Sequence, residues 1–591
     1  MASIIKLSDV WWKYEKDKDW VLKGINVDIK KGEFVLIVGP NLAGKTTLAM
    51  CFNGLVPHSY PAGEFKGNVI ISNNIDTRNY TVAEISKKVG LVFQDVETQF
   101  VTMSVEDELV FGPEIRGLSR EEIGRRLKWV LKIMRLEGLS DKAPFDISGG
   151  QKQRAAIGAA LMNMPEILVL DEPTTELDPL GKAEVLESIK QLNKELGITV
   201  ILIEHLTEET APMADRVLFL YDGKIIDEGK PDDIFQRVDH LKSKGVKPPQ
   251  VTELFYLLKK AGVPLKKLPI TFDEAESKLF ELLRPTSATF KTPKIKTTEL
   301  RVFNQKSEPI ADLSDVTFVY PDGTLALQEV SLKIFRDDPM IGIIGQNGSG
   351  KTTLAKLLAG ILKPTKGRVF LGDLDTTKAH MAEIGRKVGY VFQNPDHQIS
   401  SNTVREEVSL GPRNLGLAGL ELERRVIETM KDLEIEEFAG ENPFLLPKGV
   451  RQRIAIASVL AMKPRIIIVD EPTTGQDFKS SYTIMDKLTQ LHKRGHKIIV
   501  ITHNMSLVAE YCGRSIVIDK GRIVLDGPTG FVFMQEDVLK RTSLKPPQAT
   551  SLSNILSSIG IPAGVTSVEK LSEILINRIG LSPRSYLRSK K

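Results

Sequence analysis

Residues 340–353 read MIGIIGQNGSGKTT, a short apolar strand pattern that runs into a glycine-rich loop and the start of a helix. Residues 34–47, FVLIVGPNLAGKTT, repeat this arrangement near the beginning of the chain, except that Leu42 and Ala43 stand where the later copy has a Gly-Ser pair. Both stretches satisfy GxxxxGK[ST], in which backbone amides and a helix amino terminus cradle phosphate oxygens. The pattern therefore predicts a phosphate-binding α/β fold that occurs twice.

Other landmarks of the chain recur at an offset of about 300 residues, far longer than a solenoid repeat, which indicates a duplicated pair of domains. EILVLDEP at 166–173 returns as RIIIVDEP at 465–472, and TVILIEH at 199–205 returns as KIIVITH at 497–503. Continuous apolar runs of this kind are typical of strands buried on both faces of a parallel sheet. We therefore expect two α/β domains in tandem, each with a helical subdomain and a small carboxyl-terminal α/β extension.

Composition narrows the class of protein. The chain has 591 residues and a formal net charge of +4, with acidic and basic residues interspersed, which argues against a dedicated nucleic-acid binder. Only two cysteines occur, Cys51 and Cys512, which excludes a disulfide framework, an iron–sulfur cluster and a four-cysteine zinc site. No stretch approaches about 18 consecutive apolar residues, so we expect a chain that does not itself cross a membrane.

The chain divides into five predicted parts. Residues 1–230 and 306–528 are the two phosphate-loop domains, 231–285 and 529–591 are their extensions, and 286–305 is a linker rich in Thr, Pro and Lys. Within each extension a shorter repeat starts at Gly245 and at Ser543, and it predicts a Pro-Pro turn, an amphipathic helix, a loop and a second amphipathic helix.

The loop residues predict how phosphate would be bound. Lys45 and Lys351 are expected to pair with the β- and γ-phosphates of a nucleotide, while Thr46 and Thr352 hold Mg²⁺. One match to the loop pattern could arise by chance. Two matches, each after an apolar strand, make chance a weak explanation.

An acidic pair ends each DEP strand. Asp171 and Asp470 are expected to face Mg²⁺ through water, since Mg²⁺ keeps much of its hydration shell. Glu172 and Glu471 then lie where a general base would polarise the attacking water. A strand-end Asp-Glu pair can equally be a solvated turn, but its position about 120 residues after a phosphate loop favours the catalytic interpretation.

Residues 147–151, between the first loop and the first acidic pair, read ISGGQ. This segment resembles the signature motif of ABC-type ATPases, and the resemblance covers nearly all of the chain apart from the linker. It implies that the signature of one domain covers the nucleotide held by the other, so that two ATP molecules lie head to tail. Ser148 would offer a hydroxyl, Gly149 and Gly150 would offer backbone amides, and the helix from Gln151 would point its positive end at the γ-phosphate.

The same resemblance assigns roles to two aromatic and two amide side chains. It implies that Tyr14 and Tyr320 stack on adenine, although an aromatic residue on a strand is equally often part of the core. It also implies that Gln94 and Gln393 link Mg²⁺ and the attacking water to a membrane partner.

Two aspartates and two histidines complete the family marks. The resemblance places Asp178 and Asp477 in the loop that joins the two sites, and makes His205 and His503 switch residues that contact the γ-phosphate. A lone strand-end histidine would more often be structural, but these two share one offset. We interpret the remaining histidines as surface residues: His58, His240, His380, His397, His492 and His496.

The predicted ATP sites combine these groups. The metal would be held by Thr46, Gln94, Asp171, Thr352, Gln393 and Asp470. The nucleotide would be bound by Tyr14, Tyr320, Asp178, Asp477, the two signature segments and the two loops, that is, by Ser148, Gly149, Gly150, Gln151, Lys448, Gly449, Gly39, Pro40, Asn41, Leu42, Ala43, Gly44, Lys45, Thr46, Thr47, Gly345, Gln346, Asn347, Gly348, Ser349, Gly350, Lys351, Thr352 and Thr353.

The segments that follow the two glutamines indicate a branch of the family. FQDVETQFVTMSVEDELVFGPEIRGL and FQNPDHQISSNTVREEVSLGPRNLGL resemble the ATPases of energy-coupling factor transporters, which import vitamins and metal ions. The resemblance implies a transmembrane subunit docking near Gln94 and Gln393, a small substrate-binding membrane subunit, and a peripheral location on the cytoplasmic face of the cell membrane. The two halves would pair with each other.

The two sites are not expected to be equal. The site with Lys45 would receive the second signature, LLPKGVRQR, in which Pro447 replaces the serine and Val450 the glutamine. Proline supplies no amide donor, whereas Lys448 could add a positive charge. Leu42 would strain the first loop if its φ is positive. We therefore hypothesise that the Lys351 site hydrolyses ATP faster, the alternative being that both sites cycle.

Two other functions compete with transport. A soluble tandem ATPase acting on ribosomes or nucleic acid would place a cysteine-rich domain or a long charged insert beside the ATPase halves, and this chain has neither. A structural or DNA-repair ATPase would need long coiled coils, and no sustained heptad pattern is present.

Overall fold

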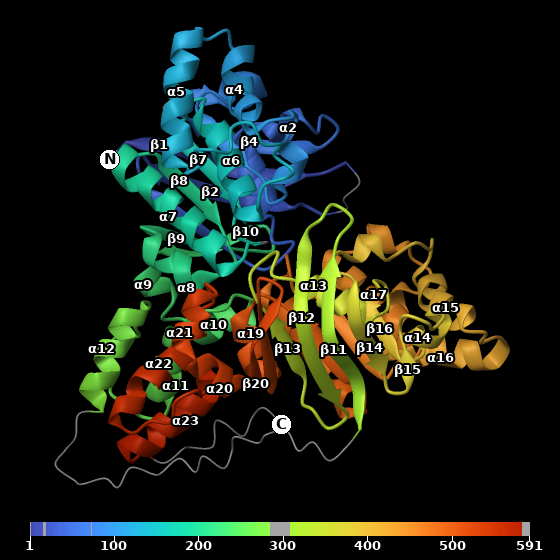
Figure 1. The fold of residues 1–591 in the computed structure, drawn as a ribbon. Helices are drawn as coiled ribbons and strands as arrows, with labels where there is room; N and C mark the ends of the chain where they lie inside the picture. The colour runs from blue at the N-terminus through green and yellow to red at the C-terminus, as the bar shows by residue number, and fades with distance from the viewer. Residues whose placement is uncertain (1, 16–18, 73, 176, 284–307, 582–591) are drawn as a thin grey trace. The chain divides into compact units, whose positions relative to one another are not determined.

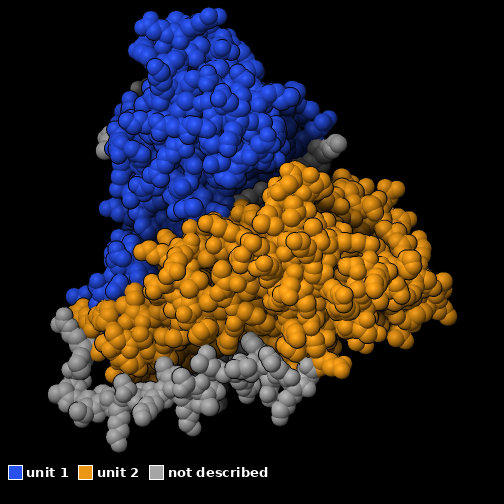
Figure 2. All heavy atoms as spheres, viewed as in Figure 1, with its two compact units in different colours: residues 1–279, 477–479 blue, residues 280–476, 480–591 orange. Residues whose placement is uncertain are grey.

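The computed structural model of the protein describes residues 2–15, 19–72, 74–175, 177–283 and 308–581. The chain forms two compact units (Figure 2), one of Met1–Leu279 with Asp477–Lys479 and one of Phe280–Gln476 with Ser480–Lys591. The predicted linker, 286–305, lies outside the described residues. Each unit contains one phosphate loop.

The first half of the chain alternates strands and helices (Figure 1). In order, its elements are β1 (Ser3–Lys13), β2 (Leu22–Lys30), β3 (Phe34–Val38), α1 (Lys45–Phe52), α2 (Leu55–His58), β4 (Glu64–Ile71), β5 (Ile75–Asp76), α3 (Val82–Ile85), β6 (Val89–Val92), α4 (Val105–Ile115), α5 (Arg120–Ile133), α6 (Gly149–Leu161), β7 (Ile167–Asp171), α7 (Pro179–Leu196), β8 (Thr199–Ile203), α8 (Thr207–Thr210), β9 (Arg216–Tyr221), β10 (Lys224–Gly229), α9 (Pro231–Ile234), α10 (Val238–Ser243), α11 (Gln250–Lys260) and α12 (Phe272–Leu282).

Two sheets build the first unit. One has the strand order β2-β1-β4-β5 and the other β10-β9-β3-β8-β7-β6. In the second sheet β3 pairs in parallel with β8 and β9, and β7 pairs in parallel with β6 and β8, as the continuous apolar runs predicted. The carboxyl ends of β3, β7 and β8 therefore meet at one edge, where ligands of open α/β sheets bind.

The central strand β3 is buried on both faces. Phe34 and Leu36 belong to a core shared with α4, α5, α6 and α7, whereas Val35 and Ile37 belong to a second core shared with α1 and the other sheet. Because successive side chains of a strand point to opposite faces, this one segment joins the two cores. The loop that follows it starts from a rigid base.

The second half repeats the pattern (Figure 1). Its elements are β11 (Pro309–Val319), β12 (Leu325–Phe335), β13 (Ile341–Ile344), α13 (Lys351–Leu358), β14 (Lys366–Leu371), β15 (Leu374–Asp375), α14 (Met381–Gly385), β16 (Val388–Val391), α15 (Val404–Asn414), α16 (Gly419–Asp432), α17 (Lys448–Leu460), β17 (Ile466–Asp470), α18 (Phe478–Lys493), β18 (Lys497–Ile501), α19 (Met505–Tyr511), β19 (Arg514–Asp519), β20 (Arg522–Pro528), α20 (Thr529–Met534), α21 (Glu536–Arg541), α22 (Gln548–Leu556) and α23 (Val568–Ile579).

The sheets of the second unit have the same topology. Their strand orders are β12-β11-β14-β15 and β16-β17-β18-β13-β19-β20. β13 pairs in parallel with β18 and β19, as β3 does with β8 and β9. The helical subdomain expected in each half is present as α4–α6 and as α15–α17.

The extensions differ from the expected α/β structure. Their described residues form helices, α9–α12 in the first half and α20–α23 in the second, with no strand among them. The physical reason is that the apolar residues of these segments recur at helical spacing, and their buried side chains join the core of their own unit, as Phe235 and Leu241 do in the first unit. The predicted pairs of amphipathic helices are confirmed, and the α/β description of the extensions is wrong.

Among the described residues, no helix combines the length and the apolar character that crossing a bilayer would require.

Candidate functional site

The first phosphate loop follows β3 and wraps around the amino terminus of α1. A side chain at Gly39 would lie 2.2 Å from the carbonyl oxygen of Leu220, so this position accepts only glycine. Gly44, before α1, has φ +98°, which also favours glycine. The Lys45 ammonium donates to the carbonyls of Gly39 at 3.2 Å and Pro40 at 3.0 Å. The lysine side chain is thus held against the backbone of the loop.

The second loop has the same geometry. A side chain at Gly345 would lie 2.3 Å from the carbonyl oxygen of Ile518, and Gly350 has φ +106°. The Lys351 ammonium donates to the carbonyls of Gly345 at 3.0 Å and Gln346 at 2.7 Å. Both loops present backbone amides and a lysine at a helix start, the arrangement that binds phosphate.

The loops differ at their exposed tip. Leu42 has φ +63° and its counterpart Gly348 has φ +75°. A left-handed conformation costs a residue with a Cβ atom roughly 1 kcal/mol or more, whereas glycine adopts it freely. The strain expected of Leu42 is therefore present in the first loop.

Each DEP strand ends with an aspartate beside the loop threonine. Thr46 hydrogen bonds to Asp171, and burial raises the pKa of Asp171 to about 6. In the second unit the Thr352 hydroxyl donates to Asp470 Oδ2 at 2.8 Å, and the pKa of Asp470 is likewise raised by burial. These pairs place two oxygen ligands next to the phosphate loop.

The aspartates fit a cation. The Oδ1 atoms of Asp171 and Asp470 are both buried without a hydrogen-bond partner within the described part of the chain. A buried carboxylate oxygen left unpaired is costly unless a ligand completes it. Carboxylate and hydroxyl oxygens are ligands that suit a hard divalent cation.

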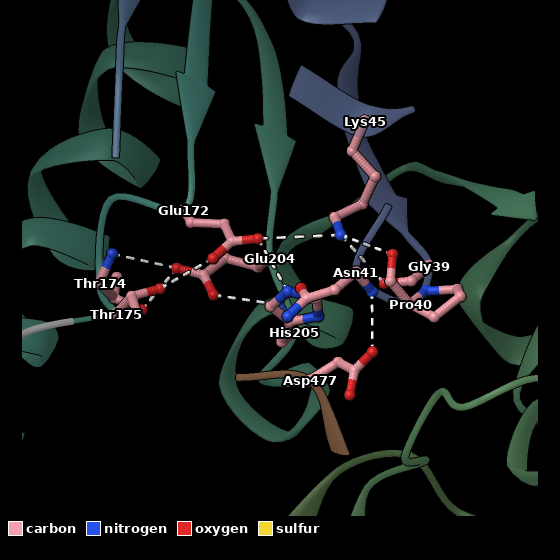
Figure 3. Close-up of polar contacts among 10 residues, drawn as sticks. All are labelled: Gly39, Pro40, Asn41, Lys45, Glu172, Thr174, Thr175, Glu204, His205 and Asp477. Atoms are coloured by element: carbon pink, nitrogen blue, oxygen red, sulfur yellow. Dashed lines mark hydrogen bonds and ion pairs between the residues drawn. The ribbon is translucent and has the colours of Figure 1, made fainter. Parts of the chain in front are cut away.

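Glu172 follows β7 and lies between the loop lysine and the switch histidine (Figure 3). Its Oε1 lies 2.7 Å from His205 Nε2 and 3.8 Å from Lys45 Nζ, and its Oε2 accepts a hydrogen bond from the Thr175 hydroxyl at 3.3 Å. Burial alone would raise the pKa of Glu172, but His205 and Lys45 hold it below its ordinary value. Glu172 is therefore ionised at neutral pH, as a general base must be.

Glu471 occupies the equivalent position in the second unit. Its Oε1 lies 2.9 Å from His503 Nδ1 and accepts the backbone amide of His503 at 3.1 Å, while Oε2 accepts the Thr474 hydroxyl at 3.2 Å. Burial opposes ionisation here too, yet His503 and Lys351 lower the pKa of Glu471. The imidazole thus meets its glutamate through Nε2 in the first unit and through Nδ1 in the second.

Both glutamates have left-handed backbone conformations, with φ 49° at Glu172 and 45° at Glu471. Such conformations cost of order 1–3 kcal/mol and tend to occur at functional sites. The strain is present in both copies, as expected if it serves to direct the carboxylates.

The signature segments start helices, as predicted. Ser148 caps α6: its hydroxyl accepts the amide of Gln151 at 3.4 Å, and the Gln151 side chain accepts the amide of Ser148 at 3.0 Å. Pro447 occupies this position before α17 and makes no side-chain cap. Lys448 and Gly449 form the first turn of α17.

The predicted adenine-stacking aromatics lie next to the loop helices. The Tyr14 hydroxyl is 3.2 Å from the Thr47 hydroxyl, and the Tyr320 hydroxyl is 3.0 Å from the Thr353 hydroxyl. Both side chains are half-buried. Each ring therefore borders the phosphate loop of its own unit.

The two glutamines and the two joining-loop aspartates lie at the ends of secondary-structure elements. Gln94 follows β6 and is half-buried, and Gln393 follows β16 and is exposed. Asp178 caps α7 by accepting the amide of Gly181 at 2.8 Å. Asp477 belongs to the first compact unit, where it accepts the amide of Asn41 at 2.8 Å (Figure 3).

The histidines assigned to the surface are mostly exposed. His58, His240, His380 and His397 are exposed. The exception is a half-buried pair on and after α18, whose ring nitrogens lie within hydrogen-bonding distance of backbone carbonyls: His492 and His496.

Two residues next to the predicted sites were missed by the sequence analysis. Glu204 directly precedes His205, and its carboxylate accepts hydrogen bonds from Thr174 (Figure 3). Tyr390 donates its hydroxyl to Asp470 Oδ2 at 2.7 Å, where the first unit has Leu91. Aligning the two halves position by position would have marked both, because each differs between the copies.

A phosphate loop, a strand-end Asp-Glu pair and a switch histidine together define a P-loop nucleoside triphosphatase. In enzymes of this class the loop cradles the phosphates, the lysine neutralises their charge, and an acidic residue polarises the attacking water. Each unit brings this set together at the carboxyl ends of the parallel strands of its six-stranded sheet.

Comparison with known proteins identifies the family. A family model described as ABC transporter matches residues 22–175 and 327–474. An ABC transporter ATP-binding protein of Caldanaerobacter subterraneus subsp. tengcongensis is 44% identical, over 93% of this chain and 96% of its own length. One of Methanosarcina mazei is 39% identical, over 97% of each chain.

One solved structure is similar to part of the chain. It is cbiO1 from Clostridium perfringens, part of the ABC transporter complex cbiONQ, which is 33% identical; the match covers 43% of this chain and 100% of that protein, with a TM-score of 0.37. The family model and the full-length relatives show that the chain belongs to the ABC transporter family. It is a tandem ABC ATPase, an ATP-binding protein with two ATPase domains.

Proposed function

We propose that the chain is the motor subunit of an importer of the energy-coupling factor type, which drives uptake of a vitamin or metal ion through separate membrane subunits. In this proposal it is peripheral to the cytoplasmic face of the membrane. Each site uses Mg²⁺, held by Thr46, Asp171 and Gln94 or by their counterparts. The bound ion would supply charge neutralisation for the phosphates.

The observation that carries this proposal is a group of exposed apolar side chains after Gln94. Met103 is 84% exposed and Ile115, at the end of α4, is 72% exposed, with Val101 and Phe111 also exposed. Exposed apolar side chains that gather on one segment are typical of a docking surface for another protein. This is the segment whose sequence resembles the energy-coupling factor ATPases.

The segment is held in the same way in both units, which supports a role in transmission. Glu108 Oε2 accepts the backbone amides of Val101 at 3.0 Å and Thr102 at 3.1 Å. Its counterpart Glu407 accepts the amides of Ser400 and Ser401, each at 3.0 Å. A buried carboxylate that accepts two consecutive backbone amides fixes the conformation of the segment that carries the exposed apolar side chains.

A second contact links the segment to the ATP site. Gln99 accepts the amide of Phe93 at 2.9 Å, and Gln398 accepts the amide of Phe392 at 3.1 Å. Phe93 and Phe392 directly precede Gln94 and Gln393. Movement of either glutamine would therefore be passed to the segment that carries the apolar side chains.

The proposal includes unequal sites, with faster hydrolysis at the Lys351 site. The strained Leu42 and the uncapped helix after Pro447 support it. The pairing of each loop with the signature of the other half stays a prediction from the sequence.

Two experiments test the proposal. A multi-spanning membrane protein should co-purify with the chain from its native source, and Met103→Asp with Ile115→Asp should abolish this without lowering ATP affinity. Glu471→Gln should then reduce ATPase activity more than Glu172→Gln. Quantitative recovery of the chain without a membrane protein would contradict the transport role. Equal losses of ATPase activity in Glu471→Gln and Glu172→Gln would contradict the unequal sites.

A role on ribosomes or nucleic acid is less well supported. The relatives that match along the full length are named as transporter ATP-binding proteins. ATP-dependent co-sedimentation with ribosomes would favour that alternative.

A further inference from the structure

The residue before the switch histidine differs between the two units. Glu204 follows β8 and Thr502 follows β18, so the two occupy the same place at the edge of the sheet. Both are buried, with 1% and 2% of their surface exposed. One copy therefore has a carboxylate where the other has a hydroxyl.

The Glu204 carboxylate binds three donors (Figure 3). Its Oε1 accepts the Thr174 amide at 3.1 Å and the Thr174 hydroxyl at 2.5 Å, and its Oε2 accepts the His205 amide at 3.2 Å. These bonds offset the cost of burying a carboxylate. They also connect the segment after Glu172 to the backbone of the switch histidine.

The second unit uses the histidine amide differently. There the His503 amide donates to the catalytic carboxylate, Glu471 Oε1, which the His503 ring also approaches. Thr502 adds a hydrogen bond to the same carboxylate. Backbone, ring and hydroxyl thus orient Glu471 together.

Glu172 lacks two of these donors. The amide of His205 is taken by Glu204, and no hydroxyl precedes the histidine. Glu172 instead lies between the His205 ring and Lys45, the lysine that must bind phosphate. Burial, and to a smaller extent the nearby Glu172 carboxylate, raises the pKa of Glu204, while Thr174 and Lys182 oppose this shift.

We propose that Glu204 is a positioning residue of the first ATP site: by accepting the His205 amide, it withdraws an orienting donor from Glu172 and makes this site the slower one. The inference rests on the proposed function, in which both sites bind ATP and the Lys351 site is faster. It adds a cause that lies wholly within the first unit, independent of Leu42 and of Pro447.

The test exchanges the two residues in full-length chains with one working site. In a Glu471→Gln chain, adding Glu204→Thr should raise kcat for MgATP about tenfold, which corresponds to roughly 1.4 kcal/mol, with KM changed less than about twofold. In a Glu172→Gln chain, adding Thr502→Glu should lower kcat by a similar factor. Glu204→Gln keeps the size of the side chain but has one acceptor oxygen, so it should give an intermediate kcat.

The outcomes separate this inference from the proposed function. If Glu471→Gln removes most activity but Glu204→Thr leaves the remaining kcat unchanged or lowers it, the positioning role is refuted and the unequal sites stand. If Glu471→Gln and Glu172→Gln lose activity equally, the unequal sites are refuted. Should Glu204→Thr fail to fold, an unchanged kcat in the Thr502→Glu chain would refute the inference by itself.

Discussion

Replacing Tyr390 by phenylalanine removes a single hydroxyl from the second ATP site. That hydroxyl donates to Asp470 Oδ2 at 2.7 Å, and both side chains are buried. Because the acceptor is a carboxylate shielded from water, the bond belongs to the charge-assisted class, worth about 1.5–3 kcal/mol. The carboxylate keeps the Thr352 hydroxyl at 2.8 Å, so the loss should fall near the lower end of this range.

The pairwise energy can be isolated with a double-mutant cycle. Tyr390→Phe, Asp470→Ala and the double variant would be unfolded with urea in the absence of nucleotide. We expect Tyr390→Phe to cost about 1.5 kcal/mol in the free energy of unfolding, and a coupling energy with Asp470→Ala of at least about 1 kcal/mol.

A tyrosine outside the ATP site provides the matched control. The Tyr511 hydroxyl donates to Asp486 at 2.9 Å, but this pair is exposed, so Tyr511→Phe should cost less than about 1 kcal/mol. A coupling energy below about 0.3 kcal/mol between Tyr390 and Asp470 would refute the reasoning, because it would mean that the buried hydroxyl does not stabilise the carboxylate.

Three further predictions follow from local geometry. Pro447→Ser should give α17 a side-chain cap and raise the free energy of unfolding by roughly 0.5–1 kcal/mol. Ser148→Ala removes the cap of α6 and should lower the free energy of unfolding, measured in urea, by about 1 kcal/mol. A loss of stability in Pro447→Ser would contradict this prediction. Gly348→Leu should lower the free energy of unfolding by at least about 1 kcal/mol because φ is +75° there, and Leu42→Gly should raise Tm. If Gly348→Leu left the stability unchanged and Leu42→Gly lowered Tm, backbone strain would be excluded as the cause. Burial lowers the pKa of Lys497 to about 8 from 10.5, so the folded state binds this proton less tightly than the unfolded state. The stability measured by thermal unfolding should therefore rise as pH increases from about 8 to 10.5. Lys497→Met should remove most of this rise.

From the sequence alone one can locate those parts of the candidate site that are formed by residues close together in the chain. The phosphate loops, the strand-end acids and the signature helices are continuous segments, and their chemistry depends on residues a few positions apart. Duplication made each assignment stronger, because chance would have to act twice at one offset. The left-handed Leu42 was also foreseeable, since its counterpart is a glycine.

Interactions between distant segments could be decided only by the tertiary structure. The Glu204 carboxylate meets Thr174 thirty positions earlier in the chain, and Tyr390 meets Asp470 from a neighbouring strand. Which ring nitrogen of His205 or His503 faces the glutamate likewise depends on packing, as does the helical structure of both extensions. A sequence pattern fixes which groups are available, but the partner of a buried polar group is chosen by the fold that brings the strand ends together.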